Sequence, residues 1–341
     1  MLGDTPMSPL SFGLVYDLLG SFPRAPEDPA DVDAEYEPEA TVELLEAAVR
    51  HLGHRPVRLG NPHALLATVG KGELPALDVA LSIAEGTRGR DREAWAPVLL
   101  QMAGVQHLGS DALTLSATLD KVWACRLVAA AGVPVVPQAV ARSADEAEGL
   151  ALPAAWPLFV KPRSEGTAKG IRPASRVDER GALVREVARV VRDYGQPAVV
   201  EAFLGGPEYT VTVVGNDPPR ALPVLQRALE ETSRIGVHAL ERHPAPGGEW
   251  RHVLPGVLDD SLERELERLA IVAYRALECR DFARADFKLD VRGQPYFLEM
   301  NPLPTFAPDA SFGILAELED RPAHELVAEV LDLGLLRLGL S

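Results

Sequence analysis

The chain has 341 residues, enough for two or three domains, and its 47% of hydrophobic residues can supply a large core. It is acidic, with 50 Asp and Glu against 34 Lys and Arg, for a formal net charge of −16. This balance argues against a nucleic-acid-binding protein, which needs a basic face, but a local pocket can still bind an anionic small molecule. Only five of the basic residues are lysines, so each is a candidate for a place that needs a compact charge; they lie at positions 71, 121, 161, 169 and 288.

The sequence shows no sign of secretion or of a membrane span. The N-terminal stretch lacks a basic segment followed by an apolar one, and no run of about 18 apolar residues occurs. The two cysteines, Cys125 and Cys279, fall in helical apolar patterns and outside any CxxC pair. We interpret them as buried thiols in a reducing compartment, and we expect a cytoplasmic protein.

The first 110 residues alternate between strand and helix patterns. Strands are predicted at 12–19, 56–59, 76–86 and 105–109, and helices at 41–53 and about 92–104. This alternation predicts a parallel sheet with helices on its faces. We interpret the acidic stretch 27–40, between the first strand and the first helix, as a solvated loop.

The rest of the chain reads as two α+β units. In the second unit, the patterns predict helices at 115–131 and 178–194, a short helix capped by Ser143, strands at 156–162 and 196–204, and a glycine-bearing turn at 163–170. In the third, they predict a strand at 209–215, an irregular stretch at 226–256, a helix from Asp260 to about 279 and a hairpin at 284–301. We therefore expect three domains, 1–110, 111–201 and 202–341.

The final hairpin gathers polar side chains on one face. Because side chains alternate along a strand, Arg284 and Asp286 share a face of the first strand, and Phe297, Glu299 and Asn301 share a face of the second. A four-residue turn would place Asp286 opposite Glu299 and Arg284 opposite Asn301. Opposed carboxylates repel, and a divalent cation that prefers oxygen ligands, such as Mg²⁺, removes the repulsion. The alternatives are a solvated face, or neutralisation of both acids by Arg284 alone.

Two lysines lie where they could contact phosphate. Lys161 ends a strand just before a turn with Gly166 and Gly170, and glycines let backbone N–H groups approach phosphate oxygens. Lys121 lies near the start of a helix. Neither GxxxxGK[ST] nor GxGxxG occurs, so an ordinary strand-turn and a solvated helix lysine remain alternatives.

Together these residues resemble the ATP-grasp superfamily and, within it, the D-alanine–D-alanine ligase family. The resemblance covers about residues 33–313 and rests on four segments in the family's order, at 83–121, 159–170, 199–216 and 273–304. The resemblance implies an α/β protein with the ATP-grasp fold. It would have an N-terminal parallel α/β domain followed by two α+β domains that clamp ATP.

The resemblance also implies roles for individual residues. Lys121 and Lys161 would bind the ATP phosphates, and a flexible lid at 164–170, with Glu165, Gly166 and Thr167, would cover them. The adenine would be bound by Glu201, Ala202, Phe203 and Leu204, and the ribose by Glu208. Two Mg²⁺ ions would be bound by Asp286, Glu299 and Asn301. Arg284 would stabilise the oxyanion of a tetrahedral intermediate, and Glu35 would bind the first substrate's amine.

The departures from the family pattern surround the substrate rather than ATP. Glu85 stands where the family usually has a histidine, and the stretch 236–243 contains His238 and Arg242 but not the Tyr and Lys of the family's mobile loop. In the terminal motif, Thr305 replaces a glycine, Ala310 stands at the position of a serine that contacts the second substrate, and Ser311 comes one residue late. We therefore expect an altered acceptor pocket.

The sequence thus predicts a carboxylate–amine ligase. It would activate an amino acid as an acyl phosphate and join it to an amine or a second amino acid, with release of ADP and phosphate. We expect small-molecule amino-acid or amine substrates and an acceptor other than D-alanine, and the family suggests a homodimer. A genuine D-alanine–D-alanine ligase of cell-wall synthesis, a non-catalytic ATP-binding module and an ATP-grasp carboxylase remain alternatives.

Overall fold

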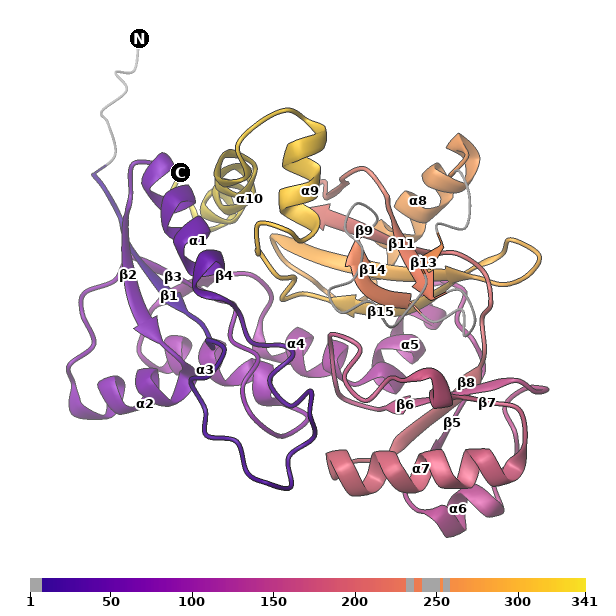
Figure 1. Cartoon of the computed structure of the whole chain (residues 1–341). Coiled ribbons are helices and arrows are strands. Elements are labelled where there is room, and N and C mark those ends of the chain that lie inside the picture. Colours follow the sequence, from indigo (N-terminus) through magenta and orange to yellow (C-terminus); the bar gives the residue numbers. More distant parts are fainter. Residues whose placement is uncertain (1–7, 231–235, 241–251, 254–257) are drawn as a thin grey trace.

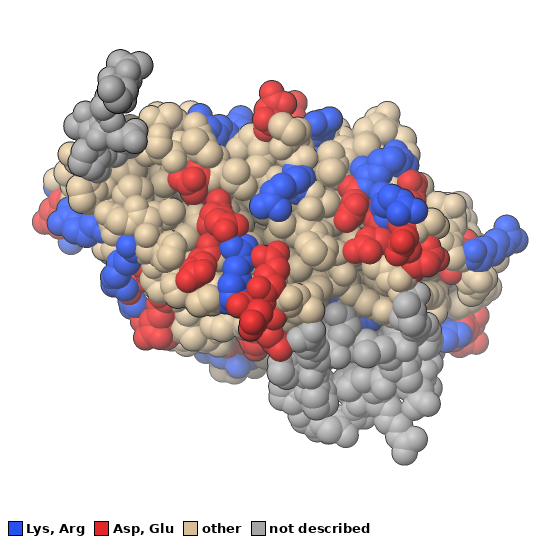
Figure 2. All heavy atoms as spheres, turned by 90° about the horizontal axis from the view of Figure 1, so that it is seen from above, with Lys and Arg blue, Asp and Glu red and all other residues tan. Residues whose placement is uncertain are grey.

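The computed structural model describes residues 8–230, 236–240, 252–253 and 258–341. Three β-sheets follow one another along the chain, and helices pack on them (Figure 1). Within the described residues, no helix is both long enough and apolar enough to cross a membrane. On the face shown in Figure 2, Lys and Arg side chains lie among Asp and Glu side chains rather than in a separate patch.

The first sheet is parallel, as the βαβ alternation predicted, with strand order β2-β1-β3-β4. Its strands are β1 (Ser11–Val15), β2 (Arg55–Gly60), β3 (Val79–Ser82) and β4 (Gln106–Leu108). Its helices are α1 (Glu39–His51), α2 (Pro62–Lys71), the 3₁₀ helix η1 (Arg92–Ala94) and α3 (Trp95–Met102). Helix α2 was not predicted, although Asn61 caps it and Pro62 begins it, both ordinary helix-start signals.

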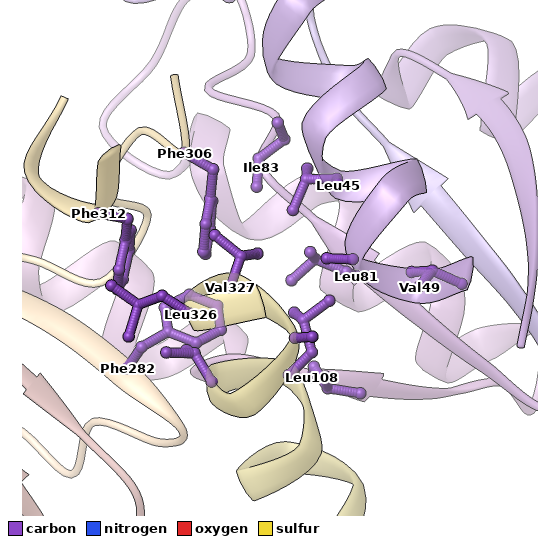
Figure 3. Close-up of a cluster of buried hydrophobic side chains, with 14 of the residues drawn as sticks. Leu45, Val49, Leu81, Ile83, Leu108, Phe282, Phe306, Phe312, Leu326 and Val327 are labelled. Atoms are coloured by element: carbon purple, nitrogen blue, oxygen red, sulfur yellow. The ribbon is translucent and has the colours of Figure 1, made fainter. Parts of the chain in front are cut away.

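The C-terminal helix packs back onto this first sheet. α9 (Ser311–Leu318) and α10 (Ala323–Leu338) end the chain, and α10 lies against α1. Figure 3 shows Val327 of α10 beside Leu45 of α1 and Leu81 of β3, and Leu326 of α10 beside Phe312 and Phe282. The two ends of the chain therefore share one hydrophobic core, while α2 and α3 cover the opposite face of the sheet with Leu65 and other buried apolar residues.

The second sheet is antiparallel, with order β5-β8-β6-β7. Its elements are β5 (Gln138–Ala141), α6 (Ala144–Glu148), β6 (Leu158–Pro162), the 3₁₀ helix η2 (Pro173–Ser175), β7 (Arg176–Val177), α7 (Arg180–Tyr194) and β8 (Ala198–Ala202). The single helix predicted before it is instead two, α4 (Ala112–Leu119) and α5 (Lys121–Ala130). The break occurs at Asp120, whose extended backbone (ψ 97°) leaves the helix and whose carboxylate accepts hydrogen bonds from the first N–H groups of α5.

The third sheet has order β12-β11-β9-β14-β15, with β10 paired to β9 and β13 to β11. Its elements are β9 (Glu208–Val214), β10 (Arg220–Ala221), β11 (Leu225–Glu230), β12 (Gly236–Leu240), β13 (His252–Val253), α8 (Asp260–Ala276), β14 (Phe282–Leu289) and β15 (Pro295–Asn301). Three of these strands fall in the stretch predicted to be irregular, so that prediction was wrong where the chain is described. Asp259, one residue before the expected start, caps α8.

The β14–β15 hairpin has the predicted register at its functional end. Arg284 pairs with Asn301 and Asp286 pairs with Glu299. A bulge then shifts the register, so that Phe287 pairs with Phe297 and their rings meet edge to face in the core. The predicted common face for Phe297 and Glu299 is therefore wrong, because Leu298 is the extra residue of the bulge and lines the same cleft as Glu299.

Candidate active site

A cleft separates the second sheet from the third. It encloses about 800 Å³ of empty space, part of it open to solvent. β6, β8 and the loop after β6 form one wall, and β9, β14 and β15 form the other. The residues that line it are Lys121, Phe159, Lys161, Pro162, Glu165, Ala168, Lys169, Ile171, Glu201, Ala202, Phe203, Leu204, Glu208, Arg227, Asp286, Lys288, Leu298 and Glu299. The cleft therefore brings together most of the residues predicted for ATP and metal binding.

One end of the cleft is apolar. Phe159 and Phe203 place their ring centroids 6.1 Å apart, and the Arg176 guanidinium lies over the Phe203 ring at 5.0 Å. Leu204 and Leu298 complete this end from the two sheets. Flat apolar walls of this kind suit a planar base, which agrees with the predicted adenine hinge at 201–204.

The two predicted phosphate lysines are both buried, and each already has an acidic partner. The Lys161 ammonium lies 2.6 Å from Glu201 Oε1, while Gln138 donates to the other oxygen of Glu201 at 2.8 Å. Burial alone would lower the pKa of Lys161, but the Glu201 carboxylate outweighs it and raises that pKa. Lys121, at the start of α5, lies 2.9 Å from Glu299 Oε2 and also donates to the Glu165 carbonyl oxygen.

The acidic pair of the hairpin is neutralised by two different cations. The Arg284 guanidinium donates to both oxygens of Asp286, at 2.9 and 2.8 Å, whereas Lys121 binds Glu299. The alternative that Arg284 alone neutralises both acids is therefore wrong. Burial would raise the pKa of Glu299, but Lys121 lowers it to about 2; burial raises the pKa of Asp286, and Arg284 only partly offsets this.

The donor atoms of this corner are the oxygen ligands that Mg²⁺ prefers. The two carboxylates lie on paired positions of neighbouring strands, with the Asn301 amide paired to Arg284 two residues further on. Asn301 Oδ1 accepts a hydrogen bond from the Leu303 N–H at 2.9 Å. A carbonyl oxygen has two lone pairs, so this bond still leaves one for a cation. Asp286, Glu299 and Asn301 therefore fit the Mg²⁺ ions that the family resemblance implies.

Glu208 is held by two cations beside Asp286, with which it shares Arg227. Lys288 lies 3.1 Å from its Oε2, and Arg227 lies 3.4 Å from its Oε1. Burial would raise the pKa of Glu208, but Lys288, followed by Arg227, lowers it. The carboxylate is thus ionised and able to accept hydrogen bonds from hydroxyl groups, as a ribose-binding role requires.

The predicted amine-binding residue, Glu35, lies under the loop that follows β6. Its Oε1 accepts from Arg92 Nη2 at 2.7 Å and from the Gly166 N–H at 2.5 Å, and its Oε2 from Lys169 at 2.7 Å. Burial would raise the pKa of Glu35, but Arg92 and Lys169 lower it. Glu35 is only 7% exposed, so the prediction that residues 27–40 form a solvated loop is wrong at its centre.

Glu85 forms a carboxyl pair with Glu93. The Glu93 side chain hydrogen-bonds that of Glu85, and the pair lies beside Arg92. Burial raises the pKa of Glu93 to about 7, and burial together with Glu93 raises that of Glu85 well above its usual range. Two buried carboxyl groups in hydrogen-bond contact share one proton more readily than they ionise together.

The terminal motif reaches the N-terminal unit through a threonine. Thr305 donates to Glu37 Oε2 at 2.9 Å and accepts from the Ala307 N–H at 3.1 Å. Ala310 precedes α9 without capping it, because alanine has no side-chain acceptor, and Ser311 is the buried first residue of that helix. Of the mobile-loop residues, Arg242 lies outside the described residues, and His238 falls in β12.

Comparison with known proteins identifies the family. A model for the D-ala D-ala ligase C-terminus matches residues 127–332, more than half of the chain. The chain belongs to the D-alanine–D-alanine ligase family. It is an ATP-grasp ligase that forms carbon–nitrogen bonds, as the sequence resemblance predicted.

Several curated relatives support this assignment. The chain is 31% identical to a D-alanine–D-alanine ligase of Desulforudis audaxviator, over 76% of this chain and 80% of that one. It is 30% identical to the corresponding enzyme of Cupriavidus necator, over 69% and 71% of the two chains. An uncharacterised protein of Sinorhizobium fredii, y4sG, is 28% identical over 84% of this chain and 85% of its own.

Solved structures share the fold over nearly the whole chain. The VanG D-Ala:D-Ser ligase of Enterococcus faecalis superposes with a TM-score of 0.69 at 18% identity, covering 96% of this chain and 99% of its own. A D-alanine–D-alanine ligase of Bacillus anthracis, solved with ATP, gives a TM-score of 0.66 at 17% identity, covering 96% and 97%. The ATP-grasp fold predicted from the sequence is therefore confirmed.

Several members of the site were not predicted from the sequence. Within this ligase, Arg92, Glu93, Lys169, Arg227 and Lys288 each contact a residue that was predicted. Two of them, Lys169 and Lys288, are among the five lysines of the chain, so the scarcity of lysine could have identified them. The others lie in sequence with no motif of their own.

Proposed function

We propose that this ligase transfers the γ-phosphoryl group of ATP to the carboxylate of an amino acid, and that an amine then attacks the acyl phosphate. A free carboxylate acylates poorly because its leaving group would be oxide, and phosphorylation replaces that group with phosphate. The products are an amide, ADP and phosphate. The observation that carries this proposal is one cleft in which buried lysines, an arginine and the Asp286–Glu299 pair lie together.

Several residues in the cleft or beside it would take part in this reaction. Lys121 and Lys161 would bind the ATP phosphates, since both are fixed in place by neighbouring carboxylates. Arg284 would donate to the oxyanion that forms when the amine adds to the carbonyl carbon. Glu165, Gly166 and Thr167 belong to the loop that would cover the phosphates, while Glu201 to Leu204 would meet the adenine and Glu208 the ribose.

We propose that Asp286, Glu299 and Asn301 hold two Mg²⁺ ions. When bound, Mg²⁺ neutralises the charge of the triphosphate and of the group in transfer. Asp286 and Glu299 would then exchange part of their present contacts with Arg284 and Lys121 for the metal. That exchange would free both cations to face the substrate, which supports their assignment to one reaction.

We propose that the acceptor is not D-alanine. Thr305 has a side chain where the family has glycine, and its hydroxyl ties the terminal motif to Glu37. Ala310 has no hydroxyl with which to contact an acceptor carboxylate. Against this stand the curated relatives named as D-alanine–D-alanine ligases, so that activity is the second candidate.

A phosphate-release assay over L- and D-amino acids, singly and in pairs, tests the proposal. We expect phosphate release to require a donor and an acceptor, with amide formation confirmed by mass spectrometry. Turnover with D-alanine alone that equals the best pair would refute the altered acceptor and establish the second candidate. Carboxylation, which needs bicarbonate, would be revealed by a requirement for that ion.

We also propose a cytoplasmic homodimer. Both cysteines are free and buried, in line with a reducing compartment. The chain exposes apolar side chains around a groove between α2, α3 and α4, including Leu66 (54% exposed) and Leu113 (73% exposed). Light scattering would measure the mass in solution, and Leu113→Asp should convert a dimer that uses this groove to a monomer.

A further inference from the structure

Lys169 lies in the lid, and the proposed binding of ATP and Mg²⁺ assigns no role to it. The lid, residues 164–170, runs from β6 toward η2, and its Lys169 side chain is 7% exposed. The Lys169 ammonium lies 2.7 Å from Glu35 Oε2 and 2.5 Å from Glu165 Oε2. It thus joins one carboxylate of the lid to one carboxylate of the N-terminal unit, 134 residues away in the sequence.

The same N-terminal carboxylate holds the start of the lid. Glu35 Oε1 accepts the Gly166 N–H at 2.5 Å and Arg92 Nη2 at 2.7 Å. Arg92 Nη1 in turn donates to the Ser164 carbonyl oxygen at 2.8 Å. Glu35 and Arg92, both on the N-terminal unit, therefore bind the lid through its backbone as well as through Lys169.

Each charge of this network has a partner of opposite sign. Arg92 and Lys169 are two buried cations, and Glu35 and Glu165 are the two carboxylates beside them. A buried ion network is tolerated only while every member keeps a partner, and loss of one partner leaves an uncompensated buried charge. The network is therefore sensitive to removal of Lys169.

A second carboxylate of the same N-terminal loop, that of Asp31, binds Gly170 at the end of the lid. Asp31 Oδ2 accepts the Gly170 N–H at 2.8 Å, and Oδ1 accepts the Tyr194 hydroxyl at 2.8 Å. In Figure 1 this loop, drawn in indigo after β1, extends from the N-terminal sheet toward the second unit. The acidic loop thus contacts the lid at both of its ends.

The lid backbone between these points is in an unfavourable conformation. Thr167 and Ala168 have φ values of 47° and 54°, in the left-handed region that residues with a Cβ avoid. Such a conformation persists only where surrounding contacts hold it. The contacts of Glu35, Lys169 and Asp31 hold the lid in this conformation, together with the turn hydrogen bond from the Lys169 N–H to the Gly166 carbonyl oxygen at 2.9 Å.

We propose that the Glu35–Lys169 ion pair is the latch that keeps the lid closed over the reacting phosphates, which makes Lys169 a positioning residue. This inference rests on the proposed function, because an acyl phosphate has to be shielded from water. If the lid opens, water adds to the acyl phosphate and the bond to phosphate breaks, leaving the carboxylate and free phosphate. ATP is then spent without amide formation.

The test compares phosphate released with amide formed. Lys169→Met keeps the length of the side chain and removes its charge. We expect the ratio of phosphate to amide to rise about tenfold or more, with the affinity for ATP changed far less. Glu35→Gln should raise the ratio too. The double variant should show a ratio no higher than that of the more strongly affected single variant, since both changes break the same Glu35–Lys169 ion pair. Lys169→Arg, which retains the ion pair, should restore coupling.

A matched control and a second readout separate the latch from a loss of fold. Lys71→Met removes an exposed lysine at the end of α2 and should leave the ratio unchanged. Amide hydrogen exchange should become faster at residues 164–170 in Lys169→Met and stay unchanged in the core strands. This readout needs no turnover, so it tests the latch even if the wild-type protein ligates no amino acid, an outcome that would overturn the proposed function alone. Unchanged exchange and an unchanged ratio in Lys169→Met would overturn the latch.

Discussion

The Arg284 guanidinium binds both oxygens of the Asp286 carboxylate, with Nε 2.9 Å from Oδ1 and Nη2 2.8 Å from Oδ2. The two residues lie on the same face of β14, two positions apart. The proposed metal ligand and the proposed oxyanion donor are therefore one hydrogen-bonded unit. A change at Asp286 should act on both steps of the reaction, phosphoryl transfer and amine addition.

Asp286→Asn should abolish most of the activity. The amide keeps the shape of the side chain but has no charge to bind a divalent cation, so we expect ADP formation to fall by about two to three orders of magnitude. The partly buried Arg284 also loses its charged partner, so the free energy of unfolding should fall by up to about 3 kcal/mol. Coupled-enzyme assay of ADP and urea unfolding measure the two effects.

Asp290→Asn is the matched control on the same hairpin. Asp290 accepts the N–H groups of Arg292 and Gln294 in the turn, and the asparagine oxygen can accept them too. Its ADP formation should stay within about twofold of the wild type, because the residue does not line the cleft. If Asp286→Asn retained wild-type ADP formation, the two-metal proposal would be wrong.

The functional hairpin could be predicted from the sequence because its determinants are local. Alternation along two short strands and a tight turn fix which residues face each other, and Asp286 does pair with Glu299. The bulge at Leu298 could not be foreseen, since it depends on how Phe297 packs against Phe287 in the core. The break between α4 and α5 at Asp120 is of the same kind, as Asp120 also binds Arg163 beyond its own helix.

The lid contacts could not be predicted, because their partners are far apart in the chain. Arg92 is 57 residues from Glu35, and Lys169 is 134 residues from it. No local periodicity records such pairs. The acidic loop 27–40 was therefore predicted to be solvated. Two of its carboxylates, Glu35 and Glu37, are in fact only 7% exposed and are hydrogen-bonded. The family resemblance located Glu35 but not the residues that hold it.

Glu93→Gln should stabilise the protein at alkaline pH. The pKa of Glu93 is raised from 4.5 to about 7, so the folded state binds the proton more tightly than the unfolded state. The stability that this proton contributes is fully present below about pH 4.5 and is lost as the pH rises through 7. Glutamine mimics the protonated acid, so we expect little effect at pH 5 and a gain of at most about 3 kcal/mol at pH 8.

Thermal or urea unfolding at the two pH values measures this difference. Glu73→Gln, at an exposed position, serves as the control and should change the stability by less than about 0.5 kcal/mol at either pH. Equal effects of Glu93→Gln at pH 5 and pH 8 would show that the carboxyl pair with Glu85 holds no shared proton.

Gly166→Ala should disturb the lid through sterics alone. A Cβ at this position would lie 2.8 Å from Glu35 Oε1, the atom that accepts the Gly166 N–H. The carboxylate would have to move, which weakens that hydrogen bond and the contact with Arg92. We expect the ratio of phosphate to amide to rise, and the lid to become sensitive to proteolysis. Gly70→Ala, in α2 with nothing within 4 Å of the added Cβ, should instead leave coupling intact and stabilise the protein by about 0.5–1 kcal/mol.

Thr305→Val tests whether the terminal motif sets the acceptor. Valine keeps the shape of threonine and removes the hydroxyl that donates to Glu37 at 2.9 Å and accepts from Ala307. Thr41, on α1, donates to the same oxygen of Glu37 at 2.8 Å, so Thr41→Val removes an equivalent hydrogen bond away from the motif. Each variant should lose about 1–2 kcal/mol of stability. We expect only Thr305→Val to raise KM for the acceptor, by about tenfold, with KM for ATP unchanged. Equal acceptor KM values in the two variants would mean that Thr305 acts on the fold and not on the choice of acceptor.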